Sequence, residues 1–140
     1  MLRPPCAEVW REPGVVPVVA AVLTRGGKTL LCRRPAHKRH GGLWEFPGGK
    51  LLPGETLGEG ARRELAEELS LRLAALGGRL GSRSDPGSPF EIHFVEVSAE
   101  GEPVPLEHAE LAWSGPADLL GYALAPGDRA FAEAWLKGRR

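Results

Sequence analysis

The feature that most constrains the fold is a helix signature over residues 56–69. Thr56, followed three residues later by Glu59, forms a capping-box pattern that favours a helix start. Apolar side chains then recur at helical spacing, at Leu57, Ala61, Leu65 and Leu69. This spacing predicts an amphipathic helix with one buried face.

Most other segments are predicted to be strands. Residues 15–23 and 29–33 are rich in apolar and β-branched side chains, and Gly26-Gly27 lies between them, which predicts a β-hairpin. The remaining expectations are a glycine-rich loop over 47–54, strands over 71–81, 90–98 and 111–113, a turn-rich loop over 82–89, a brief helix after Ser114 and a final helix over 127–137. Strands interleaved with helices indicate an α/β (α+β) layered domain over residues 15–140, after a poorly ordered lead-in at 1–14.

Composition limits the classes of partner. Eighteen Lys and Arg balance eighteen Asp and Glu, which gives no reason to expect a nucleic-acid polymer or an anionic membrane. The longest apolar stretch, residues 15–23, is too short to span a bilayer, and no targeting segment is evident. Cys6 and Cys32 lack metal-type spacing and do not indicate a disulfide framework, so a cytoplasmic location is expected.

Three closely spaced carboxylates suggest a site for a divalent cation. Glu64, Glu67 and Glu68 are spaced i, i+3 and i+4, which places them on one helix face about 5–6 Å apart. Such like charges repel, and a divalent cation such as Mg²⁺ or Mn²⁺ removes that penalty. Taken alone, a solvated acidic face explains this pattern better. The glycines at 48–49 change the balance, because they can bring a backbone carbonyl close to a cation. Arg63 is expected to support the helix surface by pairing with Glu59.

The segment 49–71 resembles a known motif. Gly49, Glu55, the run Arg63-Glu64-Leu65-Ala66-Glu67-Glu68 and Leu71 match the Nudix box, a 23-residue pattern of fixed positions. One position departs, because Ser70 stands where the family has glycine, which puts the turn after the helix in doubt. Arg33-Arg34-Pro35, residues 43–50 and residues 124–129 also look like the MutT branch, which includes oxidised-dGTP diphosphatases and CTP pyrophosphohydrolases.

The resemblance implies a Nudix-type α/β/α sandwich with a mixed β-sheet between helices. It also implies metal ligation by Glu64, Glu67 and Glu68 with the carbonyl of Gly48, and it places Arg63 among the catalytic residues. Glu107 lies six residues before Trp113, where related enzymes carry a further carboxylate that acts as ligand or general base. An exposed loop glutamate is the equally weighted alternative for Glu107.

Three other residues are candidates for substrate binding. Arg34 is expected to contact the triphosphate, with help from Arg39 or His37, although a solvated basic loop is the alternative. By resemblance, Asp128 occupies the place where MutT-like enzymes carry a base-reading Asn or Asp, and it would accept from the amino group of cytosine or the N1 and N2 donors of guanine. An N-cap of the last helix is the alternative for Asp128. Trp44, Phe46 and Phe90 are expected to be core.

With the carboxylate cluster, the resemblance implies a Mg²⁺-dependent hydrolase that converts a nucleoside triphosphate to the monophosphate and pyrophosphate, as a monomer or weak dimer. The first substrate hypothesis is 8-oxo-dGTP. The alternatives are CTP or a modified dCTP, and a non-catalytic nucleotide-binding module. A P-loop is excluded, because Trp44 and Leu51 occupy positions that require Gly and Ser or Thr.

Overall fold

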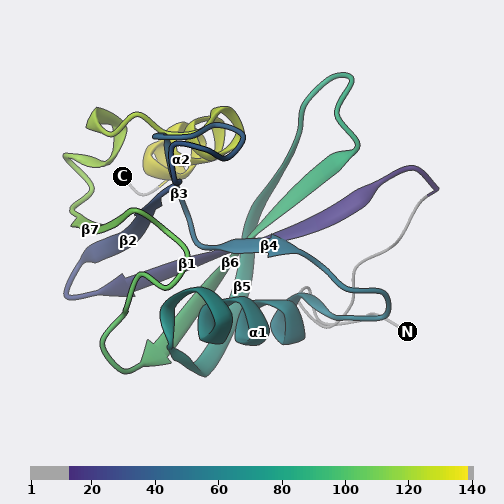
Figure 1. Ribbon diagram of the computed structural model, residues 1–140. Coiled ribbons are helices and arrows are strands. Elements are labelled where there is room, and N and C mark those ends of the chain that lie inside the picture. The colour runs from purple at the N-terminus through teal and green to yellow at the C-terminus, as the bar shows by residue number, and fades with distance from the viewer. Residues whose placement is uncertain (1–12, 139–140) are drawn as a thin grey trace.

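A seven-stranded mixed β-sheet lies between two helices in the computed structural model, which describes residues 13–138 (Figure 1). The elements in chain order are β1 Val16–Arg25, β2 Lys28–Arg33, β3 Trp44–Glu45, β4 Gly48–Lys50, α1 Leu57–Leu69, β5 Arg72–Ser84, β6 Phe90–Glu100, β7 Glu110–Ser114, the 3-10 helix Leu119–Gly121 and α2 Pro126–Gly138. Helix α1 covers one face of the sheet and α2 the other. The predicted α/β/α sandwich is therefore confirmed.

Strand β1 organises the sheet. It pairs antiparallel with β2 and with β4, and parallel with β6 along eight residue pairs from Val16–Phe90 to Leu23–Val97. The main order is β3-β2-β1-β6-β5, with β4 attached to β1 and β7 to β2. The predicted hairpin of β1 and β2 is confirmed.

Two apolar layers account for the long hydrophobic runs in the strands. Val19 and Leu23 of β1 belong to the cluster under α1, whereas Ala20 and Val22 belong to the cluster under α2. Strand β6 divides in the same way, with Val95 and Val97 under α1 and Phe94 under α2. Because both faces are covered, alternation of apolar and polar residues is weak in these strands.

Helix α1 begins at the capping box that its sequence predicts, and it ends in a left-handed residue that is serine and not the usual glycine. Glu59 N–H donates to Thr56 Oγ1 at 3.1 Å and Thr56 N–H donates to Glu59 Oε1 at 2.9 Å, which confirms the capping box. The helix ends at Ser70, which takes the left-handed conformation with φ of 57°. Serine thus adopts the backbone geometry that glycine favours, at a cost of about 1–2 kcal/mol.

Two predicted loops are partly strand. Strand β5 runs on through Ser84, because register shifts near Ala75, Arg79 and Gly81 absorb its glycines while pairing with β6 continues. Residues 48–50, predicted as loop, form β4 against Val18–Ala20. Only glycine fits at position 48, where φ is 152° and an added Cβ would lie 1.9 Å from the Val19 carbonyl oxygen.

The other predictions depend on which residues the structure describes. The predicted lead-in lies outside them apart from residues 13–14, as does Cys6. Cys32 is buried, as expected. Within residues 13–138, no helix is both long and apolar enough to cross a membrane.

Candidate active site

The backbone of β4 lies directly against the glutamate face of α1. Gly48 N–H donates to Glu68 Oε1 at 3.4 Å. A Cβ added at Gly49 would lie 2.7 Å from Glu64 Oε1, so the missing side chain is what allows this approach. The structure therefore brings Gly48, Glu64 and Glu68 together from segments 16 to 20 residues apart.

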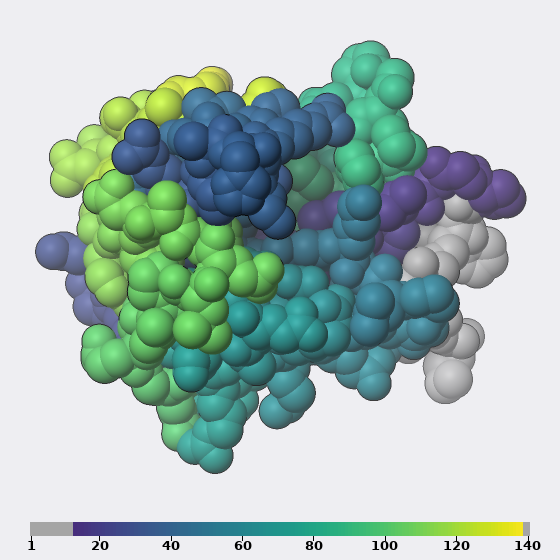
Figure 2. Space-filling view, viewed as in Figure 1, coloured from purple at the N-terminus to yellow at the C-terminus, as the bar shows by residue number. Residues whose placement is uncertain are grey.

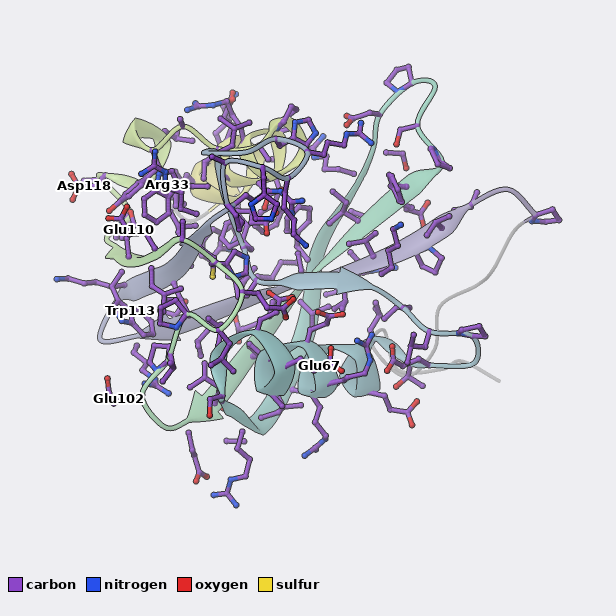
Figure 3. All side chains as sticks on the ribbon, viewed as in Figure 1. Arg33, Glu67, Glu102, Glu110, Trp113 and Asp118 are labelled. Carbon is purple, nitrogen blue, oxygen red and sulfur yellow. The ribbon has the colours of Figure 1, made fainter. Side chains whose placement is uncertain are left out.

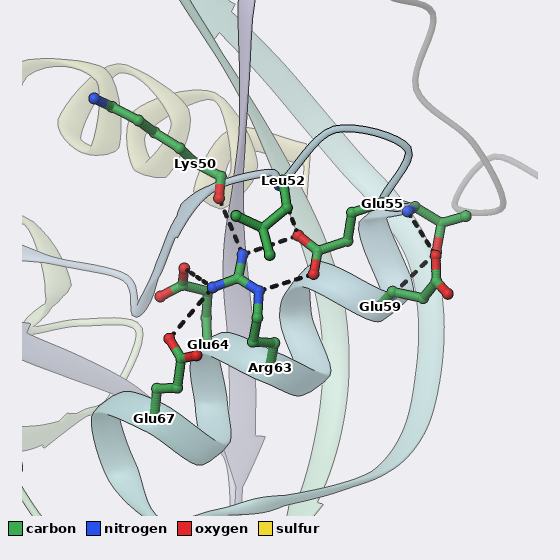
Figure 4. Close-up of polar contacts among 8 residues, drawn as sticks. Lys50, Leu52, Glu55, Glu59, Arg63, Glu64 and Glu67 are labelled. Carbon is green, nitrogen blue, oxygen red and sulfur yellow. Dashed lines mark hydrogen bonds and ion pairs between the residues drawn. The ribbon is translucent and has the colours of Figure 1, made fainter.

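Arg63 holds several carboxylates at once (Figure 4). Its guanidinium donates to both oxygens of Glu55, to Glu64 Oε1 at 2.7 Å and to Glu67 Oε2 at 3.3 Å. The hydrogen bond to Glu55 is the main reason why the pKa of Arg63 is raised. The predicted pair of Arg63 with Glu59 is wrong, because Glu59 turns back to cap the helix.

Glu67 is the most accessible member of the glutamate set. Its side chain is 55% exposed, and Figure 3 shows it on the side of α1 that faces β4. Its Oε2 accepts from Arg63, and the exposed side chain leaves room for a ligand above the helix.

Glu68 is buried beside a second carboxylate. Burial, followed by the neighbouring carboxylate of Glu64, raises the pKa of Glu68 to about 10. A divalent cation would relieve this repulsion, and carboxylate and carbonyl oxygens are donors that Mg²⁺ and Mn²⁺ prefer. The donor set therefore fits such a cation. Among residues 13–138 no three His, Cys, Asp or Glu side chains are arranged so that they could hold a metal ion, and Glu64 and Glu67 both contact Arg63.

A cavity of about 460 Å³ opens on the other side of β4. Figure 2 shows this region as a recess beneath the loop of residues 34–43, coloured dark blue. The cavity is lined by Gly48 and Gly49 of β4, by Arg34 and Arg39 and by Asp128. Three predicted substrate residues thus share one cavity, whereas His37 is exposed and is not part of its lining.

Aromatic side chains occupy different places around this cavity. Phe46 is buried in the core under α2, as expected, and Trp44 packs against the same cluster. Phe90 instead lines the cavity, with Lys50 Nζ 5.1 Å from its ring centroid. The core interpretation was wrong for Phe90, because it begins β6 at the open edge of the cavity.

Asp128 is almost completely buried at the back of the cavity. Its Oδ2 accepts the Phe46 N–H at 2.9 Å, and burial raises the pKa of Asp128 to about 7. Since α2 begins at Pro126, Asp128 lies inside the first turn and is not the N-cap. An acidic side chain there is still favourable for the helix dipole.

Arg34 is already oriented by protein partners. Its Nε donates to the Arg39 carbonyl at 2.6 Å, and its Nη1 donates to both oxygens of Glu45 at 3.2 and 3.3 Å. The guanidinium is therefore fixed in the cavity wall, while Arg39 is exposed at the rim.

The loop between β6 and β7 contributes a residue that the sequence did not suggest. Glu107 is exposed, and the next residue, His108, points inward with its Nε2 3.0 Å from Glu45 Oε2 and 3.7 Å from Glu68 Oε1. Because 63 residues separate Glu45 from His108, no local spacing could have revealed the contact. The one signal was a glutamate inside the apolar segment 43–46.

Comparison with known proteins places this geometry in context. A model of the NUDIX domain matches residues 14–135. The chain is 39% identical to the CTP pyrophosphohydrolase of Escherichia coli K12 over 125 residues, which covers 87% of this chain and 92% of that protein. It is 36% identical to the putative 8-oxo-dGTP diphosphatase 2 of Mycobacterium tuberculosis over 117 residues, with 81% and 83% coverage.

Two solved structures are similar to this chain in both fold and sequence. The solution structure of the E. coli ORF135 protein has a TM-score of 0.79 and 39% identity, covering 89% of this chain and 91% of that one. The MutT NUDIX hydrolase from Burkholderia pseudomallei has a TM-score of 0.74 and 27% identity, covering 84% and 95%.

Proposed function

Because this chain belongs to the Nudix hydrolase family, we propose that it is a Mg²⁺-dependent diphosphatase that converts a nucleoside triphosphate to the monophosphate and pyrophosphate. The observation that carries the proposal is the position of Gly48. Its N–H donates to Glu68 on the glutamate face, and the same residue lines the cavity. A nucleotide with its base in the cavity would lay its phosphates across β4 onto the carboxylates.

The residues around this path have complementary roles in the proposal. Glu64, Glu67, Glu68 and the Gly48 carbonyl would hold the cation, which when bound neutralises phosphate charge and acidifies water. Arg63 keeps Glu64 and Glu67 in place through its hydrogen bonds.

Glu107 is proposed as a further ligand or as the general base. It follows Leu106, whose N–H donates to the Glu68 carbonyl at 3.0 Å, so its loop is anchored to the end of the glutamate face. A general base must lie within hydrogen-bonding reach of the attacking water.

The base would be recognised at Asp128. One oxygen of Asp128 already accepts the Phe46 N–H, which leaves the other for the substrate. An ionised carboxylate accepts from an exocyclic amino group, and a protonated one can also donate to a ring nitrogen such as N3 of cytosine. We therefore place cytidine triphosphates first, in keeping with the 39% identical relative, and 8-oxo-dGTP second, in keeping with the 36% identical one.

A substrate panel tests both the activity and the base. The purified protein would be incubated with Mg²⁺ and the common NTPs and dNTPs, 8-oxo-dGTP, 5-methyl-dCTP, a dinucleoside polyphosphate and ADP-ribose, with Glu67→Gln as the blank. Monophosphate plus pyrophosphate from CTP or a modified dCTP supports the first choice, and preferential turnover of 8-oxo-dGTP replaces it with the second. No turnover of any triphosphate, with nucleotide binding intact, would leave the binding-module alternative.

A further inference from the structure

The site has two halves, the cavity and the glutamate face of α1. A line of polar contacts connects them, with Glu45 of β3 and His108 at its centre. Glu45 accepts two contacts from Arg34 Nη1, and its Oε2 lies 3.0 Å from His108 Nε2. The same nitrogen lies 3.7 Å from Glu68 Oε1. Arg34 lines the cavity and Glu68 belongs to the glutamate face, so a single imidazole contacts a carboxylate on each side.

The hydrogen-bonding roles follow from the partners. A carboxylate oxygen accepts, so Nε2 of His108 must carry the hydrogen and donate it to Glu45. On its other side Glu45 is an acceptor for Arg34. The orientation of Arg34 therefore depends on a carboxylate that His108 itself holds in place.

Packing alone does not account for a histidine at position 108, because burying its ring costs free energy that an apolar side chain would not cost. The His108 side chain is 6% exposed, and its Nδ1 is buried without a hydrogen-bond partner among the described residues. An unsatisfied buried polar atom costs about 1–3 kcal/mol. A leucine would fill the space without that cost, so the contacts of Nε2 are what distinguish histidine at this position.

We propose that His108 is a positioning residue that couples nucleotide binding to cation binding. Through Glu45 it fixes Arg34 in the cavity wall, and its second contact keeps Glu68 turned toward Gly48. This inference rests on the proposed function, because Arg34 and Glu68 are taken to contact the substrate and the cation. Loss of the imidazole should loosen both halves of the site together.

Two substitutions of similar size separate positioning from packing. His108→Leu fills the space but removes the donor, whereas His108→Gln places an amide nitrogen close to the position of Nε2. The readouts are the affinity for Mn²⁺ alone, the NMR signals of the Arg34 Nη–H groups, kcat and KM for the best triphosphate of the panel, and the melting temperature.

We expect His108→Leu to weaken Mn²⁺ binding and to lower kcat/KM by about 10–100-fold each, the usual effect of removing an outer-shell partner. Its Arg34 Nη–H signals should move toward those of a free arginine, because Nη1 is the atom that contacts Glu45. His108→Gln should recover each quantity to within about threefold of the wild type, since the donor is restored. In a Glu45→Gln background the KM effect of His108→Leu should largely disappear, because the intermediary is already altered.

Opposite results would overturn the proposal. Wild-type Mn²⁺ affinity and Arg34 signal in His108→Leu would show that the contacts position nothing. Equal losses in both variants, with equally lowered melting temperatures, would show a packing role. If the wild type hydrolyses no triphosphate, the proposed function fails, while the Mn²⁺ and Arg34 comparisons still decide the role of His108.

Discussion

Glu55 and Arg63 form a two-point ion pair, with Arg63 Nε 2.8 Å from Glu55 Oε2 and Arg63 Nη2 2.9 Å from Glu55 Oε1. Glu55 Oε1 also accepts the Leu52 N–H, and Arg63 Nη2 also donates to the Lys50 carbonyl. This pair thus ties the loop before α1 to the guanidinium that contacts Glu64.

Glu55→Gln should loosen this loop and the glutamates together. The Glu55 side chain is 11% exposed and that of Arg63 22%, so screening is limited and the loss should be about 1–3 kcal/mol of unfolding free energy, with kcat about tenfold lower. Urea denaturation and steady-state kinetics measure the two effects. Glu59→Gln is the matched control, because glutamine preserves a capping box. Equal losses in both variants would contradict the role of the ion pair.

Glu67→Gln should act on the chemistry and spare the fold. The side chain is 55% exposed, so unfolding free energy should change by less than about 0.5 kcal/mol. Removing a ligand charge should lower kcat by about a hundredfold or more. Glu133→Gln, on the exposed surface of α2, is the control. Full activity, or unfolding of the Glu67 variant, would show that Glu67 is not a ligand.

Ser70→Gly should stabilise the protein. With φ of 57°, Ser70 pays the steric cost of a Cβ in the left-handed region, which glycine avoids. After the greater flexibility of glycine in the unfolded chain is subtracted, a gain of roughly 0.5–1 kcal/mol remains. Thermal melting measures it, and kcat should not change. Ser70→Ala keeps the Cβ, so a similar gain in that variant would disprove the backbone explanation.

Asp128→Asn should change how stability depends on pH. Burial raises the pKa of Asp128 from 3.8 to about 7, so between these values the folded state holds a proton that the unfolded state has released. The contribution of Asp128 to stability is therefore full at low pH and falls as pH rises from about 4 to about 7. Asparagine does not titrate, and its amide oxygen can still accept the Phe46 N–H.

Melting temperatures of both proteins between pH 4 and pH 8 test this expectation. The melting temperature of Asp128→Asn minus that of the wild type should become more positive with rising pH. A constant difference would mean that the pKa of Asp128 is the same in the folded and the unfolded protein. The same variant should lower discrimination between cytosine and uracil nucleotides, measured as the ratio of their kcat/KM values.

The fold was predictable where local chemistry decides the structure. Thr56 and Glu59 marked the start of α1, and apolar segments with glycines between them marked β1 and β2. The errors fell where pairing with a distant strand overrides local preference. Gly48 was predicted to lie in a loop, but it pairs with β1 in the folded chain. Residues 82–84 were also predicted as loop, and they continue β5 because β6 lies beside them.

The candidate site divides in the same way. The spacing of Glu64, Glu67 and Glu68 follows from helix geometry and could be stated from the sequence. The contacts of Glu45 with Arg34 and His108 could not, because they join three segments that meet only in the folded chain. Arg63 was recognised as important, but its partner Glu55 lies in the preceding loop, beyond the reach of a rule for helix neighbours.

The central position of β1 has a consequence for motion. Gly48 pairs with Ala20 of β1, and its N–H donates to Glu68 Oε1, so its backbone is held between the sheet and α1 and should move little. Arg39 and His40 line the rim of the cavity and are exposed and outside any strand. We therefore expect the rim side chains to adjust to different bases on fast timescales while the Gly48 carbonyl, the proposed ligand of the cation, stays fixed, which would separate adaptability in recognition from precision in cleavage.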